Sequence, residues 1–109
     1  MATQLNVFKT VTYDLTTALS TVYTAPAGYA TVVLLCQVSN IGNSTITVDG
    51  YHVRSGTGTA LIKGASVPTN DALNLLTGRL ILQSGDSLEI SASANSSGQL
   101  LLSILETAQ

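Results

Sequence analysis

Charge is what this sequence has least of. Only 9 % of its 109 residues are charged, against about 25 % in an ordinary soluble domain, while 45 % are apolar. The polar surface must therefore consist mostly of Ser, Thr, Asn and Gln side chains. A net charge of −2 gives little repulsion between copies, and neutral polar surface is easily buried. We therefore expect the chain to function within an assembly.

Basic residues are equally scarce. Four Lys and Arg side chains are dispersed among six acidic ones. No basic stripe exists whose binding to phosphates would release counterions, so nucleic acid is not an expected partner. The sequence also lacks a run of about 18 apolar residues that could span a bilayer, and residues 1–6 lack the basic and apolar regions of a signal peptide. We expect a protein made in the cytoplasm, with no membrane partner.

Side chains that perform catalysis are nearly absent. Cys36 is the only cysteine and cannot form an internal disulfide, and its place in an apolar segment predicts a small buried residue. His52 is the only histidine, and its position beside Tyr51 and Val53 predicts a strand residue that faces solvent. One Cys and one His without a positioned third group are weak evidence for a nucleophilic dyad. The sequence predicts no catalytic residue.

Metal and sugar sites are not predicted either. Asp49, Asp71 and Asp86 each occupy a turn position, which explains them without a ligand. No window supplies the alternating oxygen ligands of a calcium loop, and zinc would need more His and Cys ligands. Tyr29 and Tyr51 are the candidates for an aromatic platform under a sugar, but packing at the sandwich edge explains them better. We expect no cofactor and no enzyme.

What the sequence does contain is a long apolar segment, residues 31–39. It begins with β-branched residues and ends at the turn residues 40–43. Apolar side chains occupy both of its alternating faces, which favours a central strand covered on two sides over an edge strand. Such a strand is not stable alone, so the rest of the chain must supply its neighbours and the facing layer.

The rest of the chain has the pattern of short strands. Alternating apolar residues recur between turn signals every 8 to 12 residues or so, and no segment has helical periodicity. The turns at Gln83–Asp86 and Asn95–Gly98 predict two hairpins, and a change of parity at Asp49–Gly50 predicts a β-bulge. Residues 64–71 are interpreted as a loop that crosses between sheets. Ala72–Leu76 is compatible with a strand or a helical turn, and we favour a strand.

This pattern predicts an all-β chain. We expect one antiparallel β-sandwich of eight or nine short strands, with a jelly-roll order as the leading topology. Residues 1–15 are predicted as an N-terminal strand or extended arm and residues 16–109 as the single sandwich domain, since a chain of this length suffices for one two-layer core. A jelly-roll enzyme or sugar-binding protein of the cupin kind is a less favoured alternative, because His52 alone cannot supply its metal ligands.

The predicted central strand and the last strand both carry apolar side chains on two faces. A sandwich of this size has few internal sources to cover a second face, and another subunit is the usual supplier. The four residues assigned to this second row are Val33, Leu35, Leu101 and Leu105. We therefore predict that they lie at a contact between identical copies.

Four segments together resemble a known group of proteins. These are VYTAPAGY at residues 22–29, VPTNDAL at 67–73, LQSGDSLEI at 82–90 and LSILE at 102–106. They resemble small virion structural proteins of tailed bacteriophages, particularly those of cyanobacteria, over most of the chain.

The resemblance implies a multi-copy, non-enzymatic virion component and carries over no catalytic residue. The favoured role within that group is a homotrimeric capsid decoration or cement protein that stabilises the head by contact with the major capsid protein. The alternative is a tail, neck, baseplate or fibre-associated module that binds an adjoining tail or neck protein. Scarce aromatic and charged residues argue against a receptor-binding tip. On this interpretation residues 1–15 could reach a neighbouring molecule.

Overall fold

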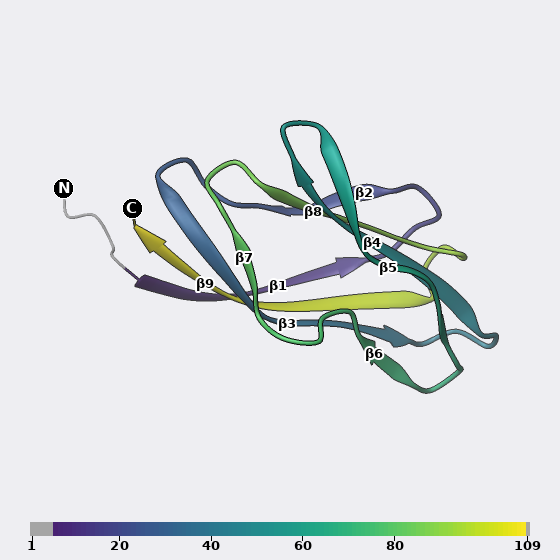
Figure 1. The fold of residues 1–109 in the computed structure, drawn as a ribbon. Coiled ribbons are helices and arrows are strands. Elements are labelled where there is room, and N and C mark those ends of the chain that lie inside the picture. Colours follow the sequence, from purple (N-terminus) through teal and green to yellow (C-terminus); the bar gives the residue numbers. More distant parts are fainter. Residues whose placement is uncertain (1–5, 109) are drawn as a thin grey trace.

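The computed structural model describes residues 6–108, which form a sandwich of two antiparallel β-sheets (Figure 1). These residues contain nine strands and no helix, and therefore no helix that could cross a membrane. The strands are β1 (Asn6–Asp14), β2 (Ser20–Thr24), β3 (Tyr29–Asn40), β4 (Ile46–Arg54), β5 (Thr57–Val67), β6 (Ala72–Asn74), β7 (Leu80–Leu82), β8 (Ser87–Ala92) and β9 (Gly98–Ala108). The predicted all-β sandwich and its strand number are confirmed.

The strand order is that of a jelly roll. One sheet has five strands, in the order β1-β9-β3-β6, with β7 also pairing with β3; the other has four, in the order β2-β8-β4-β5. β6 and β7 pair with successive parts of β3 and together act as one interrupted strand. The first strand then pairs with the last, the second with the last but one, and so on inward, as in one long hairpin rolled into two layers. The predicted topology is therefore observed.

Both predicted hairpins in the last third are wrong. β7 and β9 belong to the five-stranded sheet and β8 to the four-stranded sheet, so the turns at Gln83–Asp86 and Asn95–Gly98 carry the chain across the sandwich. A hairpin and a crossing between sheets give the same sequence pattern, because in either arrangement each strand turns alternate side chains to the core. A tight hairpin does join β4 to β5. Its two turn residues, Ser55 and Gly56, have φ of 52° and 78°, as a type I′ turn requires.

The predicted bulge at Asp49–Gly50 is misplaced. β4 keeps a continuous register with β8 through these residues, and the register shifts occur against β5, which contributes the extra residues. Gly64 of β5 has φ of 63°, and its N–H donates to Oδ1 of Asp49 at 2.6 Å. A bulge with a left-handed glycine has this geometry. Gly50 instead permits close packing, because a Cβ there would lie 2.8 Å from Cδ2 of Leu75.

Two other local predictions are settled by the strand bounds. β6 confirms a strand in place of a helical turn after Asp71. β5 continues to Val67, so the crossing between the sheets is confined to residues 68–71 and is shorter than predicted.

The core lies between the sheets and is built around β3 and β9. β3 pairs with β9 on one side and with β6 and β7 on the other, which confirms the central position predicted for residues 31–39. Along β9 the buried apolar residues are Leu100, Leu102 and Ile104. Each such side chain stabilises the fold by roughly 1.5–3 kcal/mol through burial. β1 pairs with β9 over its whole length, so residues 6–14 form an edge strand; residues 1–5 of the predicted arm lie outside the described residues.

Candidate interaction surface

An apolar row crosses the outer face of the five-stranded sheet. Residues directly opposite each other in an antiparallel ladder share a face. The register places Phe8 of β1 opposite Leu105 of β9, Leu105 opposite Val32 of β3, and Val32 opposite Ile81 of β7. The two outer members are the most exposed, with Phe8 at 74 % and Ile81 at 52 %. One continuous row thus spans four strands without a covering layer from the described chain.

Two neighbouring residues of β3 add to this row. The register between β3 and β9 shifts between Val33 and Leu35, because two residues of β3 occupy the space of one at that point. Leu34 is the extra residue and is exposed, and Leu35 lies half-buried opposite Ser103. The shift therefore enlarges the apolar surface of the outer face.

The same shift corrects one residue of the predicted contact. Val33 is fully buried in the core of its own chain, so it cannot lie at a contact between copies. Leu35, Leu101 and Leu105 do lie on the outer face, and Leu101 is exposed. Simple alternation from Leu35 places Val33 on the outer face. The extra residue Leu34 instead turns Val33 and the alternate residues before it in β3 toward the core. A subunit contact through the three outer residues stays a prediction.

Two shallow grooves flank this surface. One, of about 290 Å³, is lined by Phe8, Lys9, Thr10, Leu34, Ser103 and Ile104. The other, of about 380 Å³, is lined by Thr12, Tyr13, Asp14, Gln37, Ser39, Gln99, Leu100 and Leu101. Both run over β1, β9 and β3. Each groove is a hollow of the outer face that is open to side chains of another molecule.

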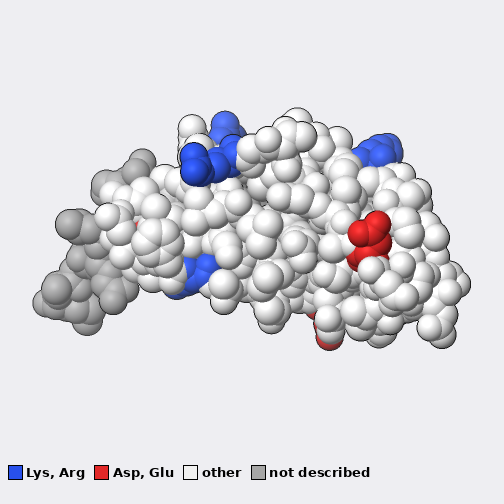
Figure 2. All heavy atoms as spheres, turned by 90° about the horizontal axis from the view of Figure 1, so that it is seen from below, with Lys and Arg blue, Asp and Glu red and all other residues white. Residues whose placement is uncertain are grey.

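Charged side chains are almost excluded from this face. Among the outward-facing residues of β1, β9 and β3, Asp14 is the only one that carries a charge. Figure 2, which views the molecule from below, shows a surface that is mostly uncharged, with only a few separated Lys, Arg, Asp and Glu side chains. Depletion of charge with retention of apolar side chains is typical of the centre of a protein interface.

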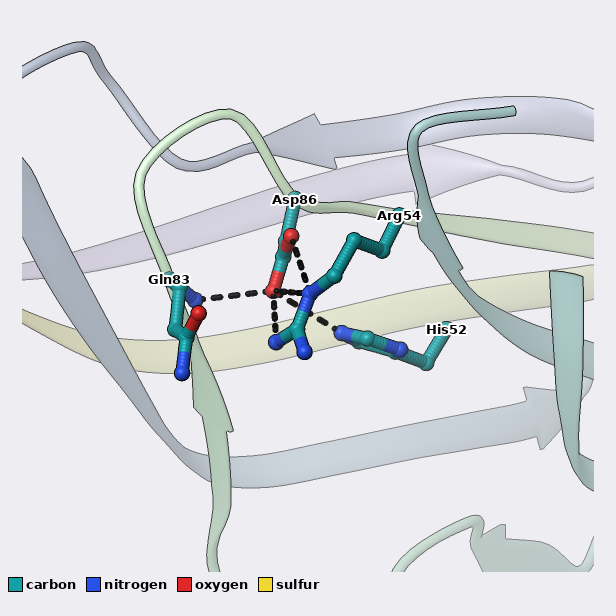
Figure 3. Close-up of polar contacts among 4 residues, drawn as sticks. All are labelled: His52, Arg54, Gln83 and Asp86. Carbon is teal, nitrogen blue, oxygen red and sulfur yellow. Dashed lines mark hydrogen bonds and ion pairs between the residues drawn. The ribbon is translucent and has the colours of Figure 1, made fainter. Parts of the chain in front are cut away.

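A buried carboxylate ties the end of the sandwich together (Figure 3). Asp86, at the crossing from β7 to β8, has a side chain that is only 4 % exposed. Its carboxylate accepts hydrogen bonds from Nε and Nη2 of Arg54, at 3.0 and 2.7 Å, and from the backbone N–H of Gln83 at 2.9 Å. Nε2 of His52 lies 3.0 Å from Oδ2, so that nitrogen carries the proton and donates. The contact fixes the crossing between β7 and β8 to β4.

The electrostatics of this cluster favour an ionised Asp86. Hydrogen bonds from Arg54 hold the pKa of Asp86 far below its usual range, against the opposing effect of burial, and the Gln83 N–H and His52 act in the same direction. The same contact raises the pKa of Arg54. His52 was predicted to face solvent, and this is wrong: it lies opposite the buried Leu88 and shares its inward face, because β4 has no bulge.

A second buried carboxylate lies at the same end. Glu106 of β9 pairs with Nζ of Lys9 at 2.9 Å and accepts a hydrogen bond of 2.5 Å from the hydroxyl of Tyr23, which is itself 2.9 Å from Oγ1 of Thr31. Burial alone would raise the pKa of Glu106, but the bonds from Tyr23 and Lys9 outweigh it and lower the pKa. Burial and Glu106 raise the pKa of Tyr23. This cluster joins β1, β2, β3 and β9.

The described residues assemble no catalytic constellation. Cys36 is buried, and burial raises the pKa of its thiol to about 12, so it is not a nucleophile. His52 is engaged with Asp86 at the end of the sandwich. Within residues 6–108 no group of three or more His, Cys, Asp or Glu side chains is placed to hold a metal ion. Tyr29 and Tyr51 belong to different sheets and do not form one platform.

Comparisons with known proteins give matches in fold only. No protein-family model matches the chain, and no curated protein matches its sequence. A chain from the disulfide-linked pili of Bacillus endospore appendages matches with a TM-score of 0.55 and 13 % identity, over 96 % of this chain and 88 % of that one. A chain from the acid-stable capsid of Helicobacter pylori bacteriophage KHP30 matches with a TM-score of 0.57 and 10 % identity, over 95 % and 88 %.

A third match is to a chain of the IBDV viral particle, with a TM-score of 0.54 and 12 % identity. It covers 97 % of this chain but only 32 % of the other. At these identities the likeness is one of fold. The same sandwich therefore occurs in subunits of a pilus, a phage capsid and a viral particle.

Proposed function

We propose that this chain is a non-enzymatic structural subunit of a bacteriophage virion, and specifically a capsid decoration or cement protein. The observation that carries the proposal is the apolar row Phe8–Leu105–Val32–Ile81 on an outer sheet face with almost no charge. A free monomer gains nothing from such a face, whereas a particle component buries it against its neighbours.

The interior of the molecule supports the same role. The Asp86 and Glu106 clusters use the buried carboxylates to connect strands of both sheets and leave neither group free for proton transfer. A rigid sandwich with one exposed apolar face suits a cement protein, which must resist strain transmitted through the capsid shell. The matches in fold to a phage capsid chain, a viral particle chain and a pilus chain are compatible with it.

The oligomer that we propose is a homotrimer that binds the major capsid protein from outside. A trimer matches the threefold symmetry of the points where capsomers meet, so that each copy makes the same contact. Burial of Leu35, Leu101 and Leu105 between copies would remove the apolar face from water. The low net charge of −2 permits copies to approach closely.

The first test is the mass of the purified chain in solution. At about 10 µM we expect a trimer by light scattering. The variant Leu101→Lys places a charge at the centre of the outer face and should weaken association at least tenfold, since an unpaired charge cannot be buried there. Thr47→Lys is the matched control, because Thr47 is an exposed residue of β4 on the four-stranded sheet. It should leave the trimer intact.

The second test is location in the particle. A cryo-EM reconstruction of the virion whose genome encodes this chain should contain its density on the outside of the head. A chain that stays monomeric at about 100 µM and is absent from the head would contradict the proposal. Density in the neck, tail or baseplate would instead support the alternative of a tail-associated module.

A further inference from the structure

The sandwich has four sheet edges, and they differ in how well they are protected. An unpaired edge exposes backbone N–H and C=O groups that can pair with another strand, and proteins usually guard it by short strands, bulges or charges. β2 has five residues and an irregular register, and β6 and β7 have three residues each. β5 is long, but two register shifts interrupt it, and Gly64 and Lys63 lie at one of them. Three edges are thus blunted.

The edge formed by β1 (purple in Figure 1) has none of these interruptions. β1 has nine residues in one unbroken register with β9, and it contains no Gly or Pro. Six of the nine residues are β-branched or aromatic, which favours extended pairing: Val7, Phe8, Thr10, Val11, Thr12 and Tyr13.

Lys9 does not protect this edge in the usual way. An inward-pointing lysine guards an edge because pairing would bury an uncompensated charge. Here Nζ of Lys9 already lies 2.9 Å from Oε1 of Glu106, so the charge is neutralised within the chain. A second strand can therefore approach β1 without burying an unpaired ammonium group.

We propose that β1 pairs antiparallel with β1 of a second copy across a twofold axis centred on Val11. Such an axis stands perpendicular to the sheet and keeps the two outer faces on the same side, so opposed residues must have numbers whose sum is even. With Val11 on the axis, Val11 faces its own copy, Lys9 faces Tyr13 of the second copy, and Thr10 faces Thr12.

The charges favour this register over its neighbours. A pairing centred on Lys9 would oppose two like charges directly, and one centred on Thr10 would bring them into diagonal contact. Centring on Thr12 would shorten the paired segment and bring the two Asp14 carboxylates closer. The register centred on Val11 separates the lysines and places Tyr13 opposite each of them, while Nζ of Lys9 keeps its contact with Glu106.

This contact goes beyond the proposed function and uses a different surface. Edge pairing joins the two five-stranded sheets into one continuous sheet and leaves the outer face of each uncovered. One copy can therefore take part in both contacts, which would link copies from neighbouring trimers. The two proposals fail independently, because Leu101→Lys acts on the outer face, whereas Val11, the residue on the proposed axis, lies opposite the buried Leu102 and so belongs to the inner face.

The experiment is a cysteine scan in the full chain, with the single variants Thr10→Cys, Val11→Cys and Thr12→Cys. Native Cys36 is buried and free, so it does not compete. Under mild oxidation at about 100 µM we expect Val11→Cys to form disulfide-linked dimer at least tenfold faster than Thr59→Cys, an exposed control on the β5 edge. Thr10→Cys and Thr12→Cys should cross-link more slowly than Val11→Cys, because each faces the other position and not itself.

A second variant keeps the test independent of the new thiols. Val11→Lys opposes two like charges on the proposed axis and should weaken edge-mediated association at least tenfold by sedimentation. Val7→Lys should not, because Val7 is a half-buried residue on the same face of β1 but lies outside the paired segment. Equal cross-linking of all three β1 variants and Thr59→Cys would overturn the proposal. Fastest cross-linking by Thr10→Cys or Thr12→Cys would overturn it as well, since it requires another register.

Discussion

The outer faces of the two sheets are built on the same alternating pattern but carry different residues. Across the β4–β8 pair of the four-stranded sheet, outward apolar residues have polar partners: Tyr51 lies opposite Glu89, and Val53 lies opposite Ser87. On the five-stranded sheet apolar residues oppose one another in the row from Phe8 to Ile81. A solvated antiparallel sheet normally presents polar residues outward. The difference supports our proposal that another molecule covers the five-stranded sheet.

The comparison also separates two roles for an apolar residue. Leu101 and Leu102 are neighbours in β9, yet one is 37 % exposed on the outer face and the other is fully buried between the sheets. Their side chains differ only in the direction in which the strand points them. A pair of substitutions at these positions can test whether the outer face serves association and the inner face serves folding.

The largest effect is expected for Leu102→Ala. Removing this side chain leaves a cavity in the core and should lower the free energy of unfolding by about 3 kcal/mol. Leu101→Ala should lower it by less than about 1 kcal/mol, because no buried space is emptied, and should weaken association instead. Urea unfolding under conditions that dissociate the oligomer measures the first quantity. Equal losses of stability in both variants would remove the distinction between the two faces.

Strand identity and sheet alternation could be predicted from the sequence because both depend on local periodicity. Residues 31–39 were correctly placed at the centre, and the jelly-roll order followed from strand number and spacing. Hairpins and sheet crossings were confused, because both need the same turn residues, as at Gln83–Asp86. Which strand pairs with which is decided by contacts distant in sequence, and these leave no local pattern.

The candidate surface shows the same limit at single residues. Leu101 and Leu105 were correctly placed on an outer row, whereas Val33 was not, because the extra residue Leu34 reverses the alternation without a glycine to signal it. Phe8 and Ile81 were missed as members of the row. Their hydrophobicity was visible, but their alignment with Leu105 depends on the pairing register. The tie between His52 and Asp86 was missed for the same reason, since they are 34 residues apart.

The next largest effect concerns the Asp86 cluster, which fixes the crossing between the sheets to β4. Asp86→Asn removes the charge that Arg54 and His52 contact and should lower the free energy of unfolding by about 2 kcal/mol at neutral pH. Asp14→Asn, at an exposed position of the outer face, should change it by less than about 0.5 kcal/mol. If the two variants are equally stable, the Asp86 cluster does not contribute to the stability of the fold.

The same carboxylate predicts how stability depends on pH. The folded-state pKa of Asp86 is lowered, so the unfolded chain binds its proton at a higher pH than the folded chain does. Its contribution is fully present above the unfolded pKa, near pH 4, and is lost as pH falls toward the folded pKa. Glu106, whose pKa is also lowered, acts in the same direction. Urea midpoints measured from pH 7 to pH 2 should fall less steeply for Asp86→Asn than for the unaltered chain.

The smallest effect is expected at the β4–β5 hairpin, which belongs to the four-stranded sheet and so lies away from the proposed contacts. Ser55 has φ of 52°, a left-handed conformation that Asn tolerates better than Ser. Ser55→Asn should raise the free energy of unfolding by about 0.5 kcal/mol, and Ser55→Val should lower it by about 1 kcal/mol, since a β-branched residue is strained there. Neither substitution should change the oligomer mass. A change in oligomer mass caused by either Ser55 substitution would mean that the four-stranded sheet also contributes to the contact. The two sheets would then differ only in how much each contributes to association.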